Sequence, residues 1–308
     1  MDTAYRGDGE HRIRNFTAQL WTLRGVMEVG DLMVMPMKST SQIAIGRIKG
    51  DYRYRADEPD AEFRHVRPVE WNITDLPRTV IKQDLLHSLG AFMTICGISR
   101  NDAARRLEQV AERGVDPGAR VRPIQREVGK NPTGSPAAAD DSDADDVGLD
   151  VERYARDQIA ARVIEIFSGH RLAELVAALL EAEGFVCRVS PAGPDQGVDI
   201  VAGMGPFGLD SPKVVVQVKS ELGAVGDGVV QQLEGVVSRQ GADQGLLVAW
   251  GGVTGAAQRE MNSRRFVLRA WNSENVLEAV FRHYRKLPAD IQAELPLKQV
   301  WTLVDETG

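Results

Sequence analysis

The segment of residues 129–150 limits what this chain can fold into, because its only bulky apolar residues are Val147 and Leu149. Proline, serine, alanine and aspartate dominate the rest, a composition that builds no core and is typical of a solvated linker. A metal site made by its aspartates is the less favoured alternative. We therefore expect two domains, residues 1–128 and 151–308, joined by an acidic flexible linker at 129–150.

Charge does not exclude a nucleic-acid partner. The net charge of −7 divides into +3 for residues 1–130, −6 for 131–150 and −4 for 151–308, so much of the deficit lies in the linker. Phosphate affinity depends on local patches rather than on the total. The sequence contains no apolar run long enough to span a membrane and no signal peptide at its start. Only Cys96 and Cys187 are present, far apart, so we expect a reduced cytoplasmic protein without disulfides.

The second domain is expected to alternate helices and strands. A connecting helix over 151–167 precedes a helix over 170–183 with leucines and valines at core spacing, which Gly184 ends. The further elements expected are strands at 185–189, 198–202 and 214–219, a helix at 229–239, a strand at 246–249, a helix at 256–263, a strand at 266–270 and a helix at 273–284. This order predicts an α/β (α+β) fold, with a mixed sheet flanked by helices on both faces.

The first domain begins with a pattern typical of strands. Strands are expected at 21–24, 32–37, 42–48 and 65–71, separated by turn residues such as Gly30-Asp31. The sequence Ser99-Arg100-Asn101-Asp102 predicts a capping box that opens a helix.

Groups that could carry chemistry lie on two consecutive strands of the second domain. Asp199 is at the start of one strand, and Gln217 and Lys219 lie in the next. Because residues two apart in a strand face the same way, Gln217 and Lys219 project together, beside Asp199. The Asp199 carboxylate, the Gln217 amide oxygen and the Val218 carbonyl suit Mg²⁺. The Lys219 ammonium can orient an attacking water or neutralise a phosphate, so the set suits phosphodiester hydrolysis.

A purely structural role is the alternative. Asp199 would then cap a turn, while Gln217 and Lys219 would lie on a solvated strand face. The run Val214-Val215-Val216 argues against this, because it predicts a central strand. A lysine and a glutamine in a buried central strand need a reason.

The sequences G-P-D-Q-G-V-D-I at residues 193–200 and Q-V-K-S at 217–220 resemble the Mrr-like catalytic domain of the PD-(D/E)xK nuclease superfamily. The helix ending in Glu183-Gly184-Phe185 and the run at 245–254 are similar to that family too, so the resemblance covers about residues 168–285. It implies a restriction endonuclease with a restriction-endonuclease-like sheet. It also implies Asp199 and Gln217 as metal ligands, Lys219 as the catalytic lysine, and Mg²⁺ as cofactor, with Mn²⁺ as a substitute.

One position departs from this family. The family often places a glutamate on the first helix of the domain, and the matching residue here is Ala173, with Glu174 one step further. One step turns a helical side chain by about 100°. Glu174 is therefore a candidate catalytic residue, and the alternative is that it is a surface glutamate.

Short motifs at 30–36, 45–48 and 67–71 resemble PUA-like barrels, which include EVE and related readers of modified bases. The resemblance, over about residues 15–95, implies a PUA-like β-barrel that holds an extruded base between aromatic side chains. The candidate DNA-contacting residues are Trp21, Tyr52, Tyr54 and Trp71, with Arg47, Arg53 and Arg67 interleaved. The alternative is that two or three of these aromatic residues belong to the core.

Together these patterns predict a type IV-like, modification-dependent restriction endonuclease in defence against foreign DNA. Its expected partner is double-stranded DNA, with or without modified bases, and no membrane. Double-strand cleavage needs two active sites, so a homodimer or DNA-induced dimer is expected. The alternatives are a DNA repair or signal-activated defence nuclease, whose first domain senses a nucleotide or a DNA structure, and a catalytically silent DNA-binding protein. The Asp199, Gln217 and Lys219 set argues against the last.

Overall fold

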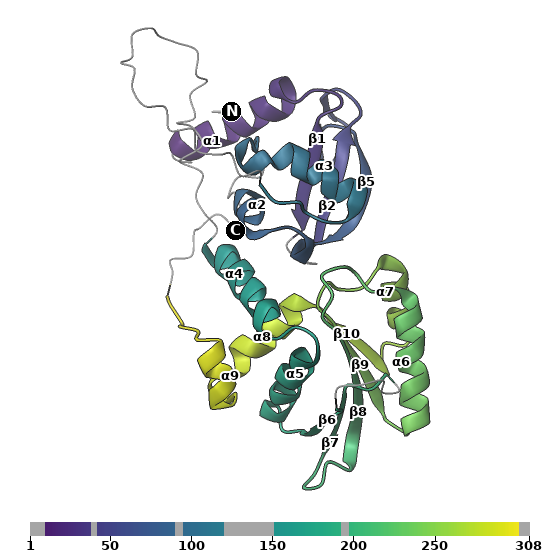
Figure 1. Cartoon of the computed structure of the whole chain (residues 1–308). Coiled ribbons are helices and arrows are strands. Elements are labelled where there is room, and N and C mark those ends of the chain that lie inside the picture. The colour runs from purple at the N-terminus through teal and green to yellow at the C-terminus, as the bar shows by residue number, and fades with distance from the viewer. Residues whose placement is uncertain (1–9, 38–41, 90–94, 120–150, 192–196, 302–308) are drawn as a thin grey trace, which may run out of the picture. The chain divides into compact units, whose positions relative to one another are not determined.

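In the computed structural model, the described residues are 10–37, 42–89, 95–119, 151–191 and 197–301 (Figure 1). The chain divides into two compact units, Met1–Asp157 and Gln158–Gly308. This boundary falls within helix α4 (Val151–Ile166), which we expected to belong wholly to the second domain. The expected linker at 129–150 lies outside the described residues. No helix among them has both the length and the apolar character needed to cross a bilayer.

Unit 1 contains antiparallel strands and short helices. Its elements are α1 (Glu10–Trp21), β1 (Leu32–Met37), β2 (Gln42–Ile48), β3 (Arg53–Tyr54), β4 (His65–Val66), β5 (Val69–Pro77), α2 (Gln83–Leu89) and α3 (Ala103–Arg113), with 3-10 turns at Ala61–Phe63, Arg78–Val80 and Arg100–Asp102. The strands form one sheet in the order β1-β2-β5 and a separate β3-β4 hairpin. The strand domain predicted from the sequence is thus present, and its described strands form open sheets.

Three local predictions for unit 1 were wrong, the first being the single strand expected at 65–71, which is divided between β4 and β5 of two different sheets. Residues 21–24, expected as a strand, continue α1 into a π-helical turn at Thr22–Val26, because the helix that begins at Glu10 carries its hydrogen bonding through them. The Ser99 side chain caps no helix. Asn101 and Asp102 adopt left-handed conformations, with φ of 58° and 54°, so the backbone kinks and α3 begins only at Ala103.

A buried arginine lies in the interior of unit 1. The Arg106 side chain is 0% exposed and donates hydrogen bonds to the carboxylates of Asp84 and Asp116 at 2.6–2.9 Å. Hydrogen bonds from Arg106 hold the pKa of Asp84 below its usual range. Burial acts to raise the pKa of Asp116, but its hydrogen bonds with Arg106 and with the Lys82 and Gly118 amides outweigh burial and lower it. The buried charge is therefore compensated on two sides.

Unit 2 is built on one five-stranded mixed sheet. Its elements after α4 are α5 (His170–Ala182), β6 (Val186–Val189), β7 (Ile200–Met204), β8 (Asp210–Lys219), α6 (Asp227–Gln240), β9 (Gln244–Ala249), α7 (Gly255–Ser263), β10 (Leu268–Trp271), α8 (Ser273–His283), a 3-10 turn (Tyr284–Lys286) and α9 (Ala289–Glu294). The strand order is β10-β9-β8-β7-β6. Strands β6, β7 and β8 are antiparallel, while β8, β9 and β10 are parallel. The predicted mixed sheet with helices on both faces is confirmed.

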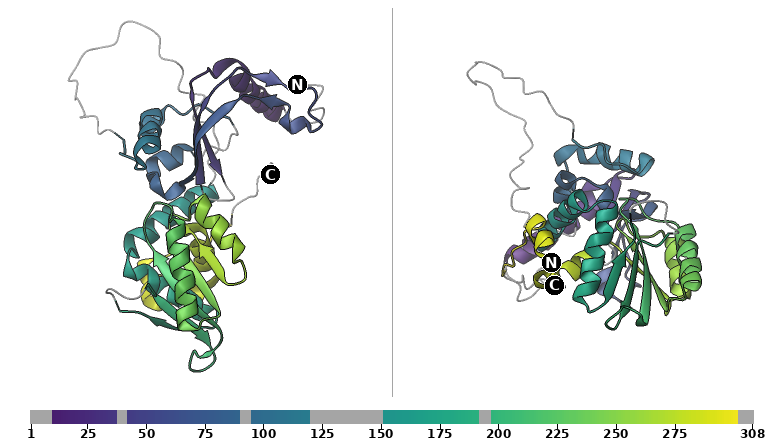
Figure 2. Two further views of the ribbon diagram at one scale, coloured as in Figure 1. Left: turned by 90° about the vertical axis from the view of Figure 1, so that its right-hand side faces the viewer. Right: turned by 60° about the horizontal axis from the view of Figure 1, so that its bottom comes forward.

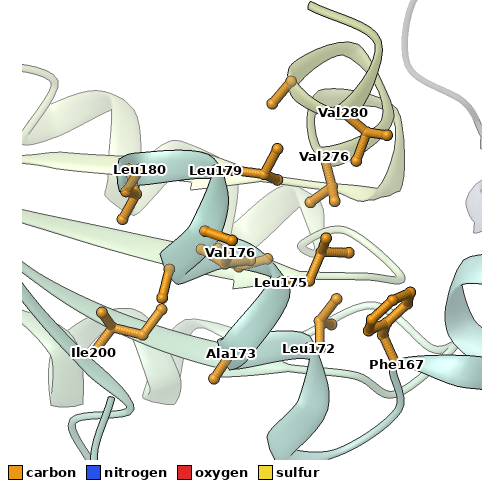
Figure 3. Packing of buried hydrophobic residues seen from close by; sticks show 14 of the residues in the cluster. Phe167, Leu172, Ala173, Leu175, Val176, Leu179, Leu180, Ile200, Val276 and Val280 are labelled. Atoms are coloured by element: carbon orange, nitrogen blue, oxygen red, sulfur yellow. The ribbon is translucent and has the colours of Figure 1, made fainter. Parts of the chain in front are cut away.

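Helices lie on both faces of this sheet (Figure 2), and one hydrophobic cluster packs on each face. On one face Val214 and Val216 of β8 pack with α5 and α8, in the cluster seen from close by in Figure 3. On the other face Val215 packs with α6 and α7. Successive residues of a strand point to opposite faces, so the three valines of β8 contribute to both clusters. The run is apolar throughout because helices cover the strand on both sides. Strand β8 is therefore the central strand that its sequence predicts.

Candidate active site

Asp199, the expected metal-binding carboxylate, lies where the pairing of strands β7 and β8 ends. Their pairing ends with Ile200 opposite Val216, and the Asp199 amide donates one more hydrogen bond to the Val216 carbonyl at 2.9 Å. The Asp199 carboxylate accepts a hydrogen bond from the Val218 amide at 2.7 Å. Asp199 is thus fixed through both backbone and side chain, and in this register the next residue across from it is Gln217.

Gln217 is a buried polar residue in an apolar strand. Its side chain lies on the α6 face of the sheet, since it follows Val215 by two residues. The residue is 4% exposed, and its oxygen Oε1 has no hydrogen-bond partner among the described residues. Gly197, with φ of +79°, lies beside it, and a Cβ there would be 3.6 Å from Gln217 Nε2. An unpartnered buried acceptor costs about 1–3 kcal/mol, so this oxygen is a strong candidate for binding a ligand.

Lys219 ends β8 on the same face as Gln217. Its backbone carbonyl accepts a hydrogen bond from the Trp250 amide at 2.8 Å, which extends the pairing of β8 with β9. The residue is half-buried, and in the described parts of the chain no carboxylate forms an ion pair with its ammonium. The structure therefore brings Asp199, Gln217 and Lys219 together at one end of the sheet.

Glu174 lies apart from this set. It is exposed on α5 and contacts the side chains of His170 and Arg171 at 3.8 and 3.6 Å. Ala173, the position at which the related family often has a glutamate, is 1% exposed and lies in the core near Ile200 (Figure 3). The contacts of Glu174 are those of a surface residue.

Several of the expected DNA-contacting residues of unit 1 have structural contacts. Arg47 bonds to the Gly30 carbonyl and pairs with Glu108 at 2.7 Å. Arg67 donates to the carbonyls of Leu23, Gly50 and Arg24. Trp71 lies half-buried in β5. Arg67 in particular binds two other backbone segments, at 23–24 and at Gly50, so its guanidinium is occupied within the unit.

The aromatic residues of the β3-β4 hairpin are more open. The rings of Tyr52 and Tyr54 both contact His65, with centroids 6.0 and 5.1 Å apart, and the Tyr52 hydroxyl lies 2.7 Å from His65 Nδ1. Tyr54 is 54% exposed, and Arg53 between the tyrosines is exposed too. Trp21 is also exposed, at the end of α1. The rings of Tyr52, Tyr54 and His65 therefore form one aromatic face on this hairpin, in which Tyr54 and His65 are exposed and Tyr52 is half-buried.

Sequence reasoning missed two residues near these sites. His65 completes the aromatic face, and its place opposite Tyr54 follows from a two-residue strand pairing that no pattern revealed. Ser220, directly after Lys219, contacts the start of α5 through its hydroxyl. The serine was visible in the motif, but its partner lies 51 residues away in the sequence.

Comparison with protein families agrees with the geometry of unit 2. Residues 164–280 match the family Mrr_cat, described as "Restriction endonuclease", and residues 3–92 match DUF8426, described as "Domain of unknown function". No curated protein matches the chain.

Three solved structures are similar to the chain at low identity. They are "Protein of Unknown Function AF1548" (18% identity, TM-score 0.29, 35% of this chain and 64% of that one), "MspJI Restriction Endonuclease in Complex with 27-mer Oligonucleotide" (16%, 0.35, 82% and 58%) and "DNA modification-dependent restriction endonuclease AspBHI" (14%, 0.37, 85% and 63%). The chain thus spans less than two thirds of each. TM-scores of this size do not establish a common fold, so the assignment comes from the family match. Residues 164–280 belong to the Mrr_cat family of restriction endonucleases, and this part of the chain is a nuclease domain.

Proposed function

We propose that this chain is a Mg²⁺-dependent DNA endonuclease in which Asp199, Gln217 and Lys219 carry out phosphodiester hydrolysis. The family of residues 164–280 supports the reaction class. The observation that carries the proposal is the buried Gln217 oxygen, which has no described partner and lies beside the Asp199 position. A cation is the kind of ligand that an amide oxygen and a carboxylate would bind together.

The donors at this place fit Mg²⁺. The Asp199 carboxylate, Gln217 Oε1 and the Val218 carbonyl would hold the ion, with waters as its remaining ligands. No group of three or more His, Cys, Asp or Glu side chains among the described residues could hold a metal, so the proposed site rests on one carboxylate and two neutral oxygens. A bound ion would lower the pKa of a water and stabilise negative charge on the phosphate. Mn²⁺ would substitute, since it also accepts oxygen ligands.

Lys219 would act on the phosphate. Its ammonium belongs to the same face of β8 as the Gln217 oxygen, and no described carboxylate neutralises it. It would orient the attacking water and stabilise the charge that develops on the phosphate oxygens. Removing one such donor from an active site commonly costs about 10²- to 10³-fold in rate.

We further propose that residues 1–128 recognise the DNA, as in a type IV-like restriction enzyme that cuts modified foreign DNA. The exposed ring of Tyr54, which contacts His65 as the half-buried Tyr52 also does, and the exposed Arg53 support this, since aromatic faces stack on bases and arginine contacts phosphate. The residues at 129–150 would act as the linker between the two domains, and a homodimer or DNA-induced dimer would supply the two active sites that double-strand cleavage needs.

A cleavage assay on methylated, hydroxymethylated, glucosylated and unmodified DNA, with Mg²⁺ or with EDTA, tests both proposals. Asp199→Ala and Lys219→Ala should each slow cleavage by at least about 10²-fold while the protein stays folded. Asp290→Ala and Lys298→Ala, which change exposed residues elsewhere in unit 2, are the matched controls. Wild-type rates for Asp199→Ala would refute the assignment. Equal cleavage of all four DNAs would refute recognition of a modification.

A further inference from the structure

Ser220 makes a long-range contact directly after the proposed catalytic lysine. Its hydroxyl oxygen accepts a hydrogen bond from the Gly169 amide at 3.0 Å. Gly169 precedes α5 and has φ of 62° and ψ of −133°, a conformation that residues with a Cβ rarely adopt. The first amides of a helix lack partners within the helix, and the Gly169 residue has no side chain to cap them. Ser220, which directly follows β8, therefore supplies a hydroxyl acceptor for the amide at the start of α5.

The contact lies behind Lys219, on the other face of the sheet. Val216 and Val218 pack in the cluster that contains α5, and Ser220 is the next residue of that row. Lys219 belongs to the opposite row, with Val215 and Gln217. Strand β8 ends at Lys219, so the position of this residue depends on the bonds made at and just after the strand end.

Two further bonds hold this strand end from the side. The Trp250 amide donates to the Lys219 carbonyl at 2.8 Å, and the Gly251 amide donates to the Glu221 carbonyl at 3.1 Å. Both come from the end of β9 and hold β8 within the plane of the sheet. The hydrogen bond to the Ser220 hydroxyl instead holds the strand end toward α5, out of the plane in which the two backbone bonds act.

We propose that Ser220 is a positioning residue that holds the backbone of Lys219 so that its ammonium points to the scissile phosphate. This inference rests on the proposed nuclease function and assigns Ser220 no contact with substrate. Misplacing a catalytic group by about 1 Å can cost about 10²-fold in rate. Loss of the hydroxyl should therefore lower the rate of the chemical step and leave DNA affinity unchanged.

The test compares Ser220→Ala with Ser220→Thr in the full chain. Single-turnover cleavage with Mg²⁺ should be about 10- to 100-fold slower for Ser220→Ala, with the Kd for DNA, measured in EDTA, within about 2-fold of wild type. Ser220→Thr keeps the oxygen and should recover most of the rate. Amide hydrogen exchange over 169–172 should become faster in Ser220→Ala only. Ser238→Ala, an exposed serine on α6, is the matched control and should cleave at the wild-type rate.

The outcomes separate this role from the nuclease proposal. Equal rates for wild type and Ser220→Ala would overturn the positioning role and leave the nuclease proposal intact. A slow Ser220→Ala that Ser220→Thr does not rescue would also overturn it, because the hydroxyl would then not be the cause. A wild-type protein that cuts no DNA would overturn the proposed function, and the role of Ser220 with it.

Discussion

Replacing Gln217 by methionine should stabilise the protein while removing its metal response. Methionine keeps an unbranched side chain of similar length and removes the amide. The buried oxygen has no described partner, and such a group costs about 1–3 kcal/mol. We expect the free energy of unfolding of unit 2 in EDTA to rise by about 1–2 kcal/mol. For a domain of this size that corresponds to a Tm increase of about 2–8 °C.

Magnesium should reverse this order. An ion present at about 100 times its Kd stabilises a folded protein by about 2.7 kcal/mol, which would raise the wild-type Tm by about 5–11 °C. Gln217→Met lacks one proposed ligand and should gain much less. The order of the two Tm values is therefore expected to reverse between EDTA and 10 mM Mg²⁺. The variant should have the higher Tm in EDTA, and wild type should have the higher Tm in Mg²⁺.

Thermal unfolding followed by circular dichroism measures both effects, and Gln232→Met, on the exposed side of α6, serves as control. The control should respond to Mg²⁺ as wild type does. A lower Tm for Gln217→Met in EDTA would mean that the amide is bonded within the protein. An unchanged response of the variant to Mg²⁺ would mean that Gln217 is no ligand. Either result would refute the reasoning.

Three further predictions concern the rest of the chain. Because Arg106 holds the pKa of Asp116 below its usual value, this carboxylate stabilises the fold above about pH 4 and loses its effect as the pH falls through the lowered pKa. Asp116→Asn should lower the free energy of unfolding by about 3 kcal/mol at pH 7. It should also weaken the fall of this free energy at acid pH, measured by denaturant unfolding at a series of pH values; an unchanged fall would contradict this. Burial, and secondarily Glu181, raises the pKa of Cys187 to about 12. Alkylation of Cys187 at pH 8, followed by mass spectrometry, should therefore be about 10³-fold slower than that of a free thiol. Labelling at the rate of a free thiol would show that the Cys187 thiol is not buried. Tyr54→Ala should weaken binding of the recognised modified DNA by about 5- to 150-fold. Arg53→Ala should weaken binding of all duplexes alike in titrations at two salt concentrations, and equal losses for both variants on unmodified DNA would argue against base stacking.

The nuclease domain was largely predictable because its signals are local. The valine run at 214–216 and the period of the leucine-rich helix depend on neighbours within one element, so they place β8 and α5 directly. The alternation of residues along β8 also placed Gln217 beside Lys219. That these residues act in catalysis is still a prediction.

Unit 1 was harder, because its determinants are distant in sequence. Trp21 and Thr22 favour strands in isolation, yet they continue a helix that starts more than a turn earlier. The carbonyl partners of Arg67 and the carboxylate partners of Arg106 belong to segments that the sequence pattern does not connect. For the same reason the contact between Ser220 and Gly169 could not be foreseen from the motif.

The parallel pairing of β8 with β9 has a consequence for the newly made chain. Asp199 and Lys219 leave the ribosome well before Trp250, whose amide bonds to the Lys219 carbonyl. Parallel strands need a crossover, here helix α6, so β9 can reach β8 only after that helix has been synthesised. A nascent chain carrying all three proposed catalytic residues therefore still lacks the strand that completes their support. Cleavage activity should appear late in synthesis, and chains truncated before β9 should be harmless to the DNA of the cell that makes them.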